Sequence, residues 1–161
     1  LSIIVGGDGA VFEACEPLFE DIGEDVFHVG PVPGHGHAVK LLNNYLSNVA
    51  LIATSEAVIL GDRAGLDRET LVDVFSVSSG RNSANQDKIP NHVLTGEYDM
   101  GFKLGLMEKD MRLLSEFAGD QQVPMLLGHV TRDITGYAKT KKGYDGDMTR
   151  VYDFLEELMI E

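Results

Sequence analysis

Residues 34–44 read Gly-His-Gly-His-Ala-Val-Lys-Leu-Leu-Asn-Asn and open the longest helical pattern in the sequence. From Val39 the chain continues to Leu60 without a Gly or Pro, which is long for a helix of a globular protein. At 100° per residue, one broad side of this helix is apolar, at positions 42, 45, 46, 49, 52 and 53. We therefore expect one long central helix, buried over most of its circumference, inside a mainly helical domain.

The remaining arc of the helix carries polar residues, namely Lys40, Asn43, Asn44, Ser47 and Asn48. One interpretation is the solvated face of an amphipathic helix. Asparagine is a poor helix former, however, and a solvated face is usually richer in Glu, Lys and Arg. The alternative is a functional site, because a lysine held among amides and apolar groups would have a lowered pKa and suit proton transfer.

The spacing Gly-x-Gly-x-x-x-Lys-x-x-Asn-Asn, from Gly34 to Asn44, resembles the catalytic signature of the β-hydroxyacid dehydrogenases. That family includes 3-hydroxyisobutyrate dehydrogenase, tartronate semialdehyde reductase and, more distantly, 6-phosphogluconate dehydrogenase. A second segment, residues 101–110, resembles the family's Phe-x-x-x-Leu-x-x-Lys-Asp motif at the expected distance downstream. The resemblance covers essentially the whole chain.

This resemblance implies an enzyme that moves a hydride between NAD or NADP and a small 3-hydroxy acid or its semialdehyde. Lys40 would be the general acid/base, with a pKa drawn from about 10.4 toward the operating pH. Asn44 and Asn43 would bind the substrate. Gly36 would bind it as well, because the free backbone N–H groups of a helix start favour a carboxylate.

The resemblance also assigns residues to the cofactor. Lys109 corresponds to the lysine that approaches the dinucleotide, with Phe102 nearby, and Asp110 either orients Lys109 or caps local backbone. The 2′-phosphate choice between NAD and NADP is made in a domain that precedes these residues.

The domain organisation that the resemblance implies has two parts. Residues 1–33 would be the last strand, helix and strand of a Rossmann domain plus a linker, and residues 34–161 a 6-phosphogluconate dehydrogenase C-terminal-like helical domain. We expect the chain to be a C-terminal fragment, inactive alone, because it begins with Leu1 inside a strand-like run. The helical domains are expected to form a homodimer or homotetramer around the long helix.

Composition limits the other function classes. A formal charge of −13 in 161 residues argues against a nucleic-acid partner, since that binding needs clustered Lys and Arg. Cys15 is the sole cysteine, so an intrachain disulfide is excluded. No apolar run approaches the roughly 20 residues that span a bilayer. We expect no membrane partner and a cytoplasmic location.

A glycine-rich turn and three histidines could suggest a phosphate site and a metal site, but we expect neither. Gly-Gly-Asp-Gly at residues 6–9 matches neither dinucleotide nor Walker phosphate-binding patterns, and Asp8 would repel a phosphate, so we expect a plain turn. The histidines His28, His35 and His37 lack the partners of known zinc sites, so we predict no metal.

Downstream, five helices are expected. The first is capped by Asp67, and a short one breaks at Ile89-Pro90. A third extends from Leu104 to Ala118 and is closed by Gly119, and a fourth starts at Val123-Pro124. A last helix follows residues 145–147.

In the family, residues 81–85 face the substrate pocket. Arg81 would either bind a second anionic group or be an ordinary surface arginine. Two alternatives for the whole protein stay open. One is a 6-phosphogluconate or other sugar-acid dehydrogenase, and the other is a non-catalytic helical dimerisation module.

Overall fold

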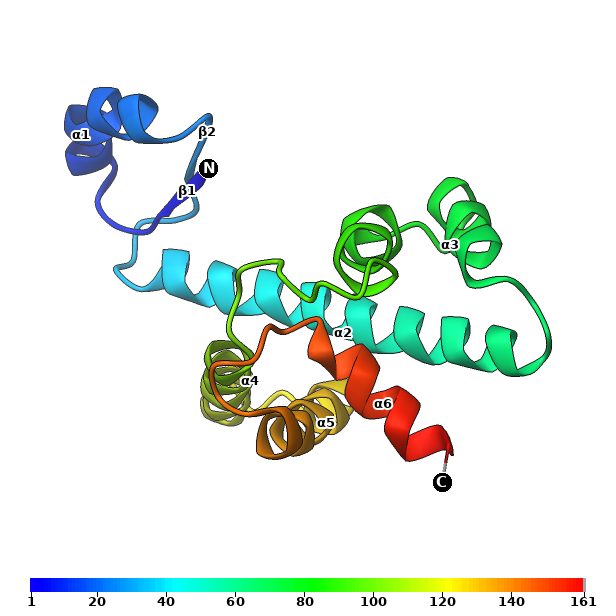
Figure 1. Cartoon of the computed structure of the whole chain (residues 1–161). Coiled ribbons are helices and arrows are strands. Elements are labelled where there is room, and N and C mark those ends of the chain that lie inside the picture. The colour runs from blue at the N-terminus through cyan, green and yellow to red at the C-terminus, as the bar shows by residue number, and fades with distance from the viewer. Residues whose placement is uncertain (161) are drawn as a thin grey trace. The chain divides into compact units, whose positions relative to one another are not determined.

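A computed structural model describes residues 1–160, without the side chain of residue 160. The chain divides into two compact units, Leu1–Asn44 and Tyr45–Glu161, which are described separately below. The fold is mainly helical, with a short β-α-β segment at its start, as the sequence predicted (Figure 1).

The first unit contains that β-α-β segment. Strand β1 (Ser2–Val5) pairs in parallel with β2 (Asp25–His28), and helix α1 (Gly9–Ile22) connects them. Asp8 is the N-cap of α1, where its carboxylate accepts hydrogen bonds from the backbone N–H groups of Ala10 and Val11. The Gly-Gly-Asp-Gly run therefore forms a strand-to-helix turn with its own acidic cap.

Helix α2 (His35–Arg63) is the long helix, and it passes from the first unit into the second. Within the second unit it buries a stripe that consists of Asn48, Leu51, Ile52, Thr54, Ser55, Val58, Ile59 and Gly61. Leu46 and Leu60, by contrast, are exposed. The prediction of burial over most of the circumference is wrong for this chain. The reason is that apolar residues occur on several sides of α2, and the buried side includes polar residues such as Ser55, whose hydroxyl donates to the Leu51 carbonyl.

The second unit continues with five further helices. These are α3 (Arg68–Val77), η1 (Ala84–Val93), α4 (Leu104–Asp120), α5 (Leu126–Lys142) and α6 (Arg150–Ile160). Helix α3 contacts η1, and α5 contacts both α4 and α6 (Figure 1). Asp67 caps α3 by accepting from the Thr70 N–H, as expected, and Gly65 has a φ of 86° after α2.

Three helix boundaries differ from the predictions. Helix η1 does not break at Ile89-Pro90 but continues to Val93 as a π-helix, whose wider i→i+5 turns relieve the clash that proline causes in an α-helix. Helix α4 passes Gly119 and ends at Asp120, and Gln122 takes the left-handed conformation (φ 56°) instead of a glycine. Helix α5 begins at Leu126, two residues after Pro124.

The core of the second unit gathers around the middle of α2. Leu51, Val58 and Ile59 pack there with buried apolar residues of the other helices, including Met107, Met111, Val151 and Tyr152. A buried polar link joins α2 to α5, where the Asn48 side-chain amide donates to Thr135 Oγ1 at 2.8 Å. No helix within residues 1–160 is long and apolar enough to cross a bilayer.

Candidate functional site

The first motif starts where α2 begins, in the first unit. Gly36 is buried against β1, and a Cβ on it would lie 2.5 Å from the Ile4 carbonyl oxygen. Only a glycine permits this approach of helix to strand. The approach leaves a hollow of about 290 Å³ lined by Ser2, Ile4, Gly36, His37 and Lys40. The structure therefore brings Gly36 and Lys40, two of the predicted site residues, to one hollow.

Lys40 is exposed in this chain rather than buried among amides and apolar groups. No acidic residue lies in the first turn of α2, so the positive end of the helix dipole is not neutralised there. The backbone N–H groups of this turn and the Lys40 ammonium together form a suitable environment for an anion.

The two asparagines differ in their surroundings. Asn44 lies one turn after Lys40, is half-buried and engages in a polar interaction, whereas Asn43 is exposed. The i and i+4 spacing puts Lys40 and Asn44 on the same face of α2. Asn43, at i+3, is also a neighbour of Lys40 on the helix surface.

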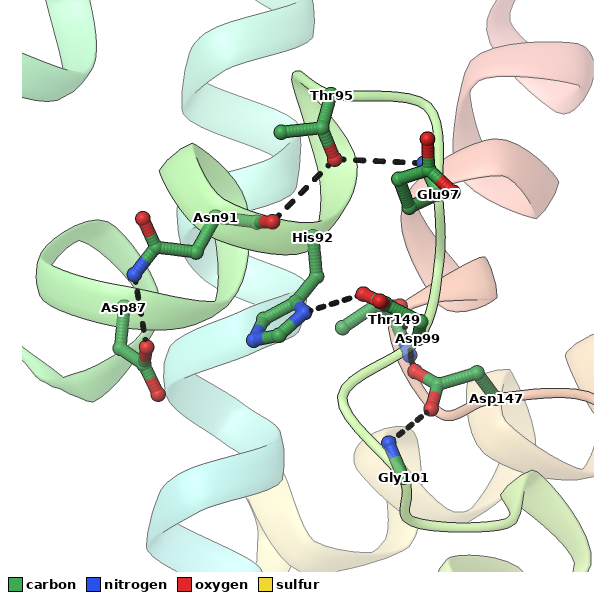
Figure 2. Close-up of polar contacts among 9 residues, drawn as sticks. All are labelled: Asp87, Asn91, His92, Thr95, Glu97, Asp99, Gly101, Asp147 and Thr149. Carbon is green, nitrogen blue, oxygen red and sulfur yellow. Dashed lines mark hydrogen bonds and ion pairs between the residues drawn. The ribbon is translucent and has the colours of Figure 1, made fainter.

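The second motif, residues 101–110, lies in the second unit, and hydrogen bonds to the turn before α6 fix its start. Asp147 accepts a hydrogen bond from the Gly101 N–H at 2.8 Å through one carboxylate oxygen (Figure 2). Its other oxygen accepts from the N–H and hydroxyl of Thr149. The Met148 N–H donates to the carbonyl of Phe102 at 2.8 Å. Asp147 therefore positions the start of α4. From the sequence, residues 145–147 were expected only to precede the last helix.

Side-chain contacts also hold residues 92–99, the segment that precedes this motif. His92 Nδ1 lies 2.6 Å from Asp99 Oδ1, and Thr95 accepts from the Glu97 N–H (Figure 2). Tyr98 has a positive φ of 51°, and the Arg150 guanidinium lies 4.7 Å from the centre of its ring. A non-glycine residue persists in this conformation only where its surroundings hold it.

On α4, Lys109 is half-exposed and its Nζ lies 3.0 Å from Oδ1 of Asp110, which is 2% exposed. This geometry agrees with the expectation that Asp110 orients Lys109. The side chain of Phe102 packs against the hydrophobic core and is half-buried. The cofactor roles of Lys109 and Phe102 stay predictions.

Of the three histidines predicted not to bind metal, His28 has other side-chain contacts. His28 Nε2 lies 2.7 Å from the Gly7 carbonyl oxygen, and the His28 ring stacks on Phe12. Among residues 1–160, no group of three or more His, Cys, Asp or Glu side chains is arranged to hold a metal ion.

Residues 81–88 contain a feature that the sequence analysis missed. Arg81 is exposed, whereas Lys88 is buried in η1 and donates to Ser83 Oγ at 2.7 Å. Desolvation lowers the pKa of Lys88 below its ordinary value. This burial was not predicted, because a helix that breaks at Ile89-Pro90 would place Lys88 at its end, where a lysine is normally solvated.

Comparisons with known proteins identify the family. A family described as the NAD-binding domain of NADP-dependent 3-hydroxyisobutyrate dehydrogenase matches residues 34–155. The chain belongs to this family. The matched region starts at Gly34 and includes both motifs described above.

Named relatives of the 3-hydroxyisobutyrate dehydrogenase family span the chain. The 2-(hydroxymethyl)glutarate dehydrogenase of Eubacterium barkeri is 38% identical over 125 residues, which is 78% of this chain and 41% of that protein. The mitochondrial 3-hydroxyisobutyrate dehydrogenase of Mus musculus is 34% identical over 98% of this chain and 48% of its own. The chain thus spans about half the length of these relatives.

A solved structure gives the same assignment. The Mycobacterium tuberculosis 3-hydroxyisobutyrate dehydrogenase, solved with L-serine, superposes with a TM-score of 0.85 at 26% identity. The superposition covers 96% of this chain and 54% of that one. The mainly helical fold with its β-α-β start is therefore a fold of this dehydrogenase family.

Proposed function

We propose that the complete protein is an NAD(P)-dependent dehydrogenase of small 3-hydroxy acids, and that Lys40 is its general acid/base. The observation that carries the proposal is the start of α2, where an exposed Lys40 and the close-packed Gly36 line one hollow. Membership of the 3-hydroxyisobutyrate dehydrogenase family supports the reaction class.

Each side chain of the proposed site has a separate role in the reaction. A bound NAD or NADP would supply the acceptor for the hydride that leaves the hydroxyl-bearing carbon. Lys40 removes the proton of the substrate hydroxyl during oxidation and returns it during reduction. Asn44 orients the substrate oxygen by hydrogen bonding, Asn43 assists it, and the N–H groups around Gly36 bind the substrate carboxylate.

The residues proposed for the cofactor are Lys109 and Phe102. Lys109 Nζ is half-exposed and held by the buried Asp110, so a cation is presented from a fixed point of α4. That charge fits the pyrophosphate or 2′-phosphate of a dinucleotide. Phe102 is tied through its carbonyl to the Met148 N–H and would offer an apolar surface.

The substrate is proposed from the relatives' names. Both 3-hydroxyisobutyrate and 2-(hydroxymethyl)glutarate carry a hydroxymethyl group on the carbon next to a carboxylate, and L-serine shares that arrangement. We test the proposal with the complete enzyme, by following NADH or NADPH absorbance with these three compounds. Reduction of either dinucleotide by at least one of them supports the proposal, and its absence with all three contradicts it.

We further propose that residues 1–33 end a Rossmann domain and that this chain alone is inactive. The parallel β-α-β segment supports the first point. The second follows because the chain spans about half the length of its relatives. Turnover by the 161-residue chain alone would contradict this proposal.

We also propose that the helical domains self-associate. Leu46 on α2 and Leu126, Leu127 and Val130 on α5 are more than half exposed, and α2 and α5 are joined by the Asn48–Thr135 bond. A surface of this kind is typical of protein contacts. Light scattering should give a dimer or tetramer that Leu46→Glu or Val130→Glu disrupts. A monomeric wild-type protein would contradict the proposal.

The cytosol is our proposed compartment, supported only by the free Cys15 and the ordinary globular composition. The Mus musculus relative is mitochondrial by name. Cell fractionation would distinguish the two compartments.

A further inference from the structure

Two adjoining hollows lie where α3 contacts η1 in the second unit (Figure 1). The larger, of about 420 Å³, is lined by Glu69, Val72, Asp73, Pro90, Leu94 and Thr95. The smaller, of about 350 Å³, shares Glu69 and Leu94 with the larger and is also lined by Tyr152 of α6. Hollows of this size are large enough for small ligands. Neither contains a residue proposed for the dehydrogenase reaction.

The rim of the two hollows is negatively charged. Asp67 is the N-cap of α3, and Glu69 and Asp73 follow it on the same helix, with all three exposed. Glu69 and Asp73 are spaced i and i+4, so their like charges repel each other across one turn. In the part of the chain that the structure describes, neither of them forms an ion pair with a basic side chain. A bound cation would relieve this repulsion.

The basic side chain at the smaller hollow is already paired. Arg68 Nη2 lies 2.7 Å from Asp62 Oδ2 and 2.6 Å from Glu156 Oε1. Two carboxylates thus surround one guanidinium group, and this cluster is itself negative. The hollows therefore favour a cationic ligand over an anionic one.

The surface between the carboxylates is apolar. Val72 and Val93 are 2% and 5% exposed, and Leu94 lines both hollows. An aliphatic chain that covers these side chains would be removed from water, which is favourable. The carboxylates are not arranged around a metal ion, since residues 1–160 contain no group of three or more His, Cys, Asp or Glu that could hold one. This combination fits an organic cation.

An independent feature, the Tyr152 hydroxyl, also points to a ligand in the smaller hollow. Tyr152 is 1% exposed, and among the described residues its hydroxyl has no hydrogen-bond partner. Burial raises the pKa of this hydroxyl to about 12, so it is neutral at physiological pH. The charges of Arg68 and Asp62 also act on this pKa, and both residues line the hollow, so the hydroxyl lies at its base. Its oxygen can accept a hydrogen bond from a bound ligand.

We propose that the two hollows bind a linear aliphatic diamine, with one ammonium group in each. One ammonium group donates to the Tyr152 oxygen beside Asp62, and the other lies beside Glu69 and Asp73. The methylene chain between them covers Leu94. A diamine fits better than a monoamine because carboxylates lie at both ends of this apolar surface.

Calorimetric titration of the complete protein with 1,5-diaminopentane tests the proposal. A salt concentration of about 0.15 M screens binding to scattered surface charges. We expect saturable binding of one molecule per chain. The monoamine 1-aminopentane should bind about 10-fold more weakly, because it leaves one set of carboxylates without a cation. Equal affinity for the two amines, or no saturable binding, would overturn the proposal. The titration needs neither dinucleotide nor hydroxy acid, so its outcome is independent of the proposed function.

Tyr152→Phe tests the hydroxyl by two measurements. The variant should bind the diamine about 10-fold more weakly, because the ammonium group loses its acceptor. Its thermal stability without ligand should equal or exceed that of the wild type, since the variant removes a buried hydroxyl that has no partner. Unchanged binding would contradict the proposal, and so would a loss of stability, which would show that the hydroxyl is satisfied within the protein.

Charge variants separate this site from general attraction to an acidic protein. Glu69→Gln and Asp73→Asn should each weaken binding of the diamine about 2- to 5-fold, as expected for exposed ion pairs. The matched control is Asp133→Asn, which removes one charge from an exposed position on α5 outside both hollows and should leave binding unchanged. If Asp133→Asn weakened binding as much as Asp73→Asn does, the diamine would be only a counter-ion and the proposal would fail.

Discussion

Lys109 Nζ lies 3.0 Å from Oδ1 of Asp110, a carboxylate that is 2% exposed on α4. The buried carboxylate thus provides the half-exposed lysine with an ion-pair partner on its own helix. The Gly101–Asp147 hydrogen bond fixes the segment before α4. The second family motif therefore has a contact at each end, a hydrogen bond at Gly101 and an ion pair at Lys109.

The first prediction concerns this pair. Asp110→Asn removes the charge that orients Lys109, so the KM for NAD or NADP should rise several-fold with little change in kcat. Lys109→Met should raise that KM further. The matched control is Glu108→Gln, also on α4, which breaks an ion pair with Lys139 of α5 and should leave the cofactor KM unchanged. A normal cofactor KM in Asp110→Asn beside a raised one in Lys109→Met would exclude an orienting role.

The second prediction concerns Gly36. Gly36→Ala places a Cβ 2.5 Å from the Ile4 carbonyl oxygen, so strand or helix must shift. We expect a loss of about 1–3 kcal/mol in the free energy of unfolding, measured by urea denaturation. Gly136→Ala, at an uncrowded position inside α5, should be neutral or slightly stabilising. Equal stability of the two variants would show that the close approach is not required.

The third prediction concerns the buried bond between α2 and α5. Thr135→Val leaves the Asn48 amide buried without this acceptor, which should cost about 1–3 kcal/mol of unfolding free energy. Thr140→Val removes the same kind of helix hydroxyl bond from an exposed position and should change stability by less than about 0.5 kcal/mol. Matching losses in urea denaturation would contradict the importance of the Asn48–Thr135 bond.

The fourth prediction concerns the pH dependence that Lys88 confers. Burial lowers its pKa in the folded chain, opposed by the charge of Asp87, so below the unfolded value of about 10.4 the unfolded state binds more protons. The wild type should therefore gain stability relative to Lys88→Met as the pH rises toward that value. Thermal unfolding of both proteins from neutral to alkaline pH measures the difference. A difference that does not vary with pH would mean that Lys88 is not perturbed.

The parts of the fold that depend on local chemistry were predictable from the sequence. The acidic cap at Asp67 and the left-handed Gly65 depend on residue types with strong local preferences. The β-α-β start followed from β-branched residues and a glycine-rich turn. The two family motifs identified the candidate site residues, which local chemistry alone did not single out.

The parts that depend on tertiary packing were not predictable. The buried side of α2 is chosen by its partners, such as Thr135 for Asn48, because apolar residues lie around much of that helix. The π-helix through Pro90 allows a proline that local rules place at a helix end. The burial of Lys88 was missed for the same reason, since it depends on η1 continuing past Ile89-Pro90 to Val93.

The most direct test of the central claim is the rate of the chemical step in Lys40→Met, measured with the complete enzyme at saturating dinucleotide and 3-hydroxy acid. We expect kcat to fall about 10²- to 10⁴-fold, as is typical for loss of a general acid/base, while dinucleotide affinity and thermal stability stay near wild type. A variant that retains near-normal kcat would remove Lys40 from the mechanism and contradict the account.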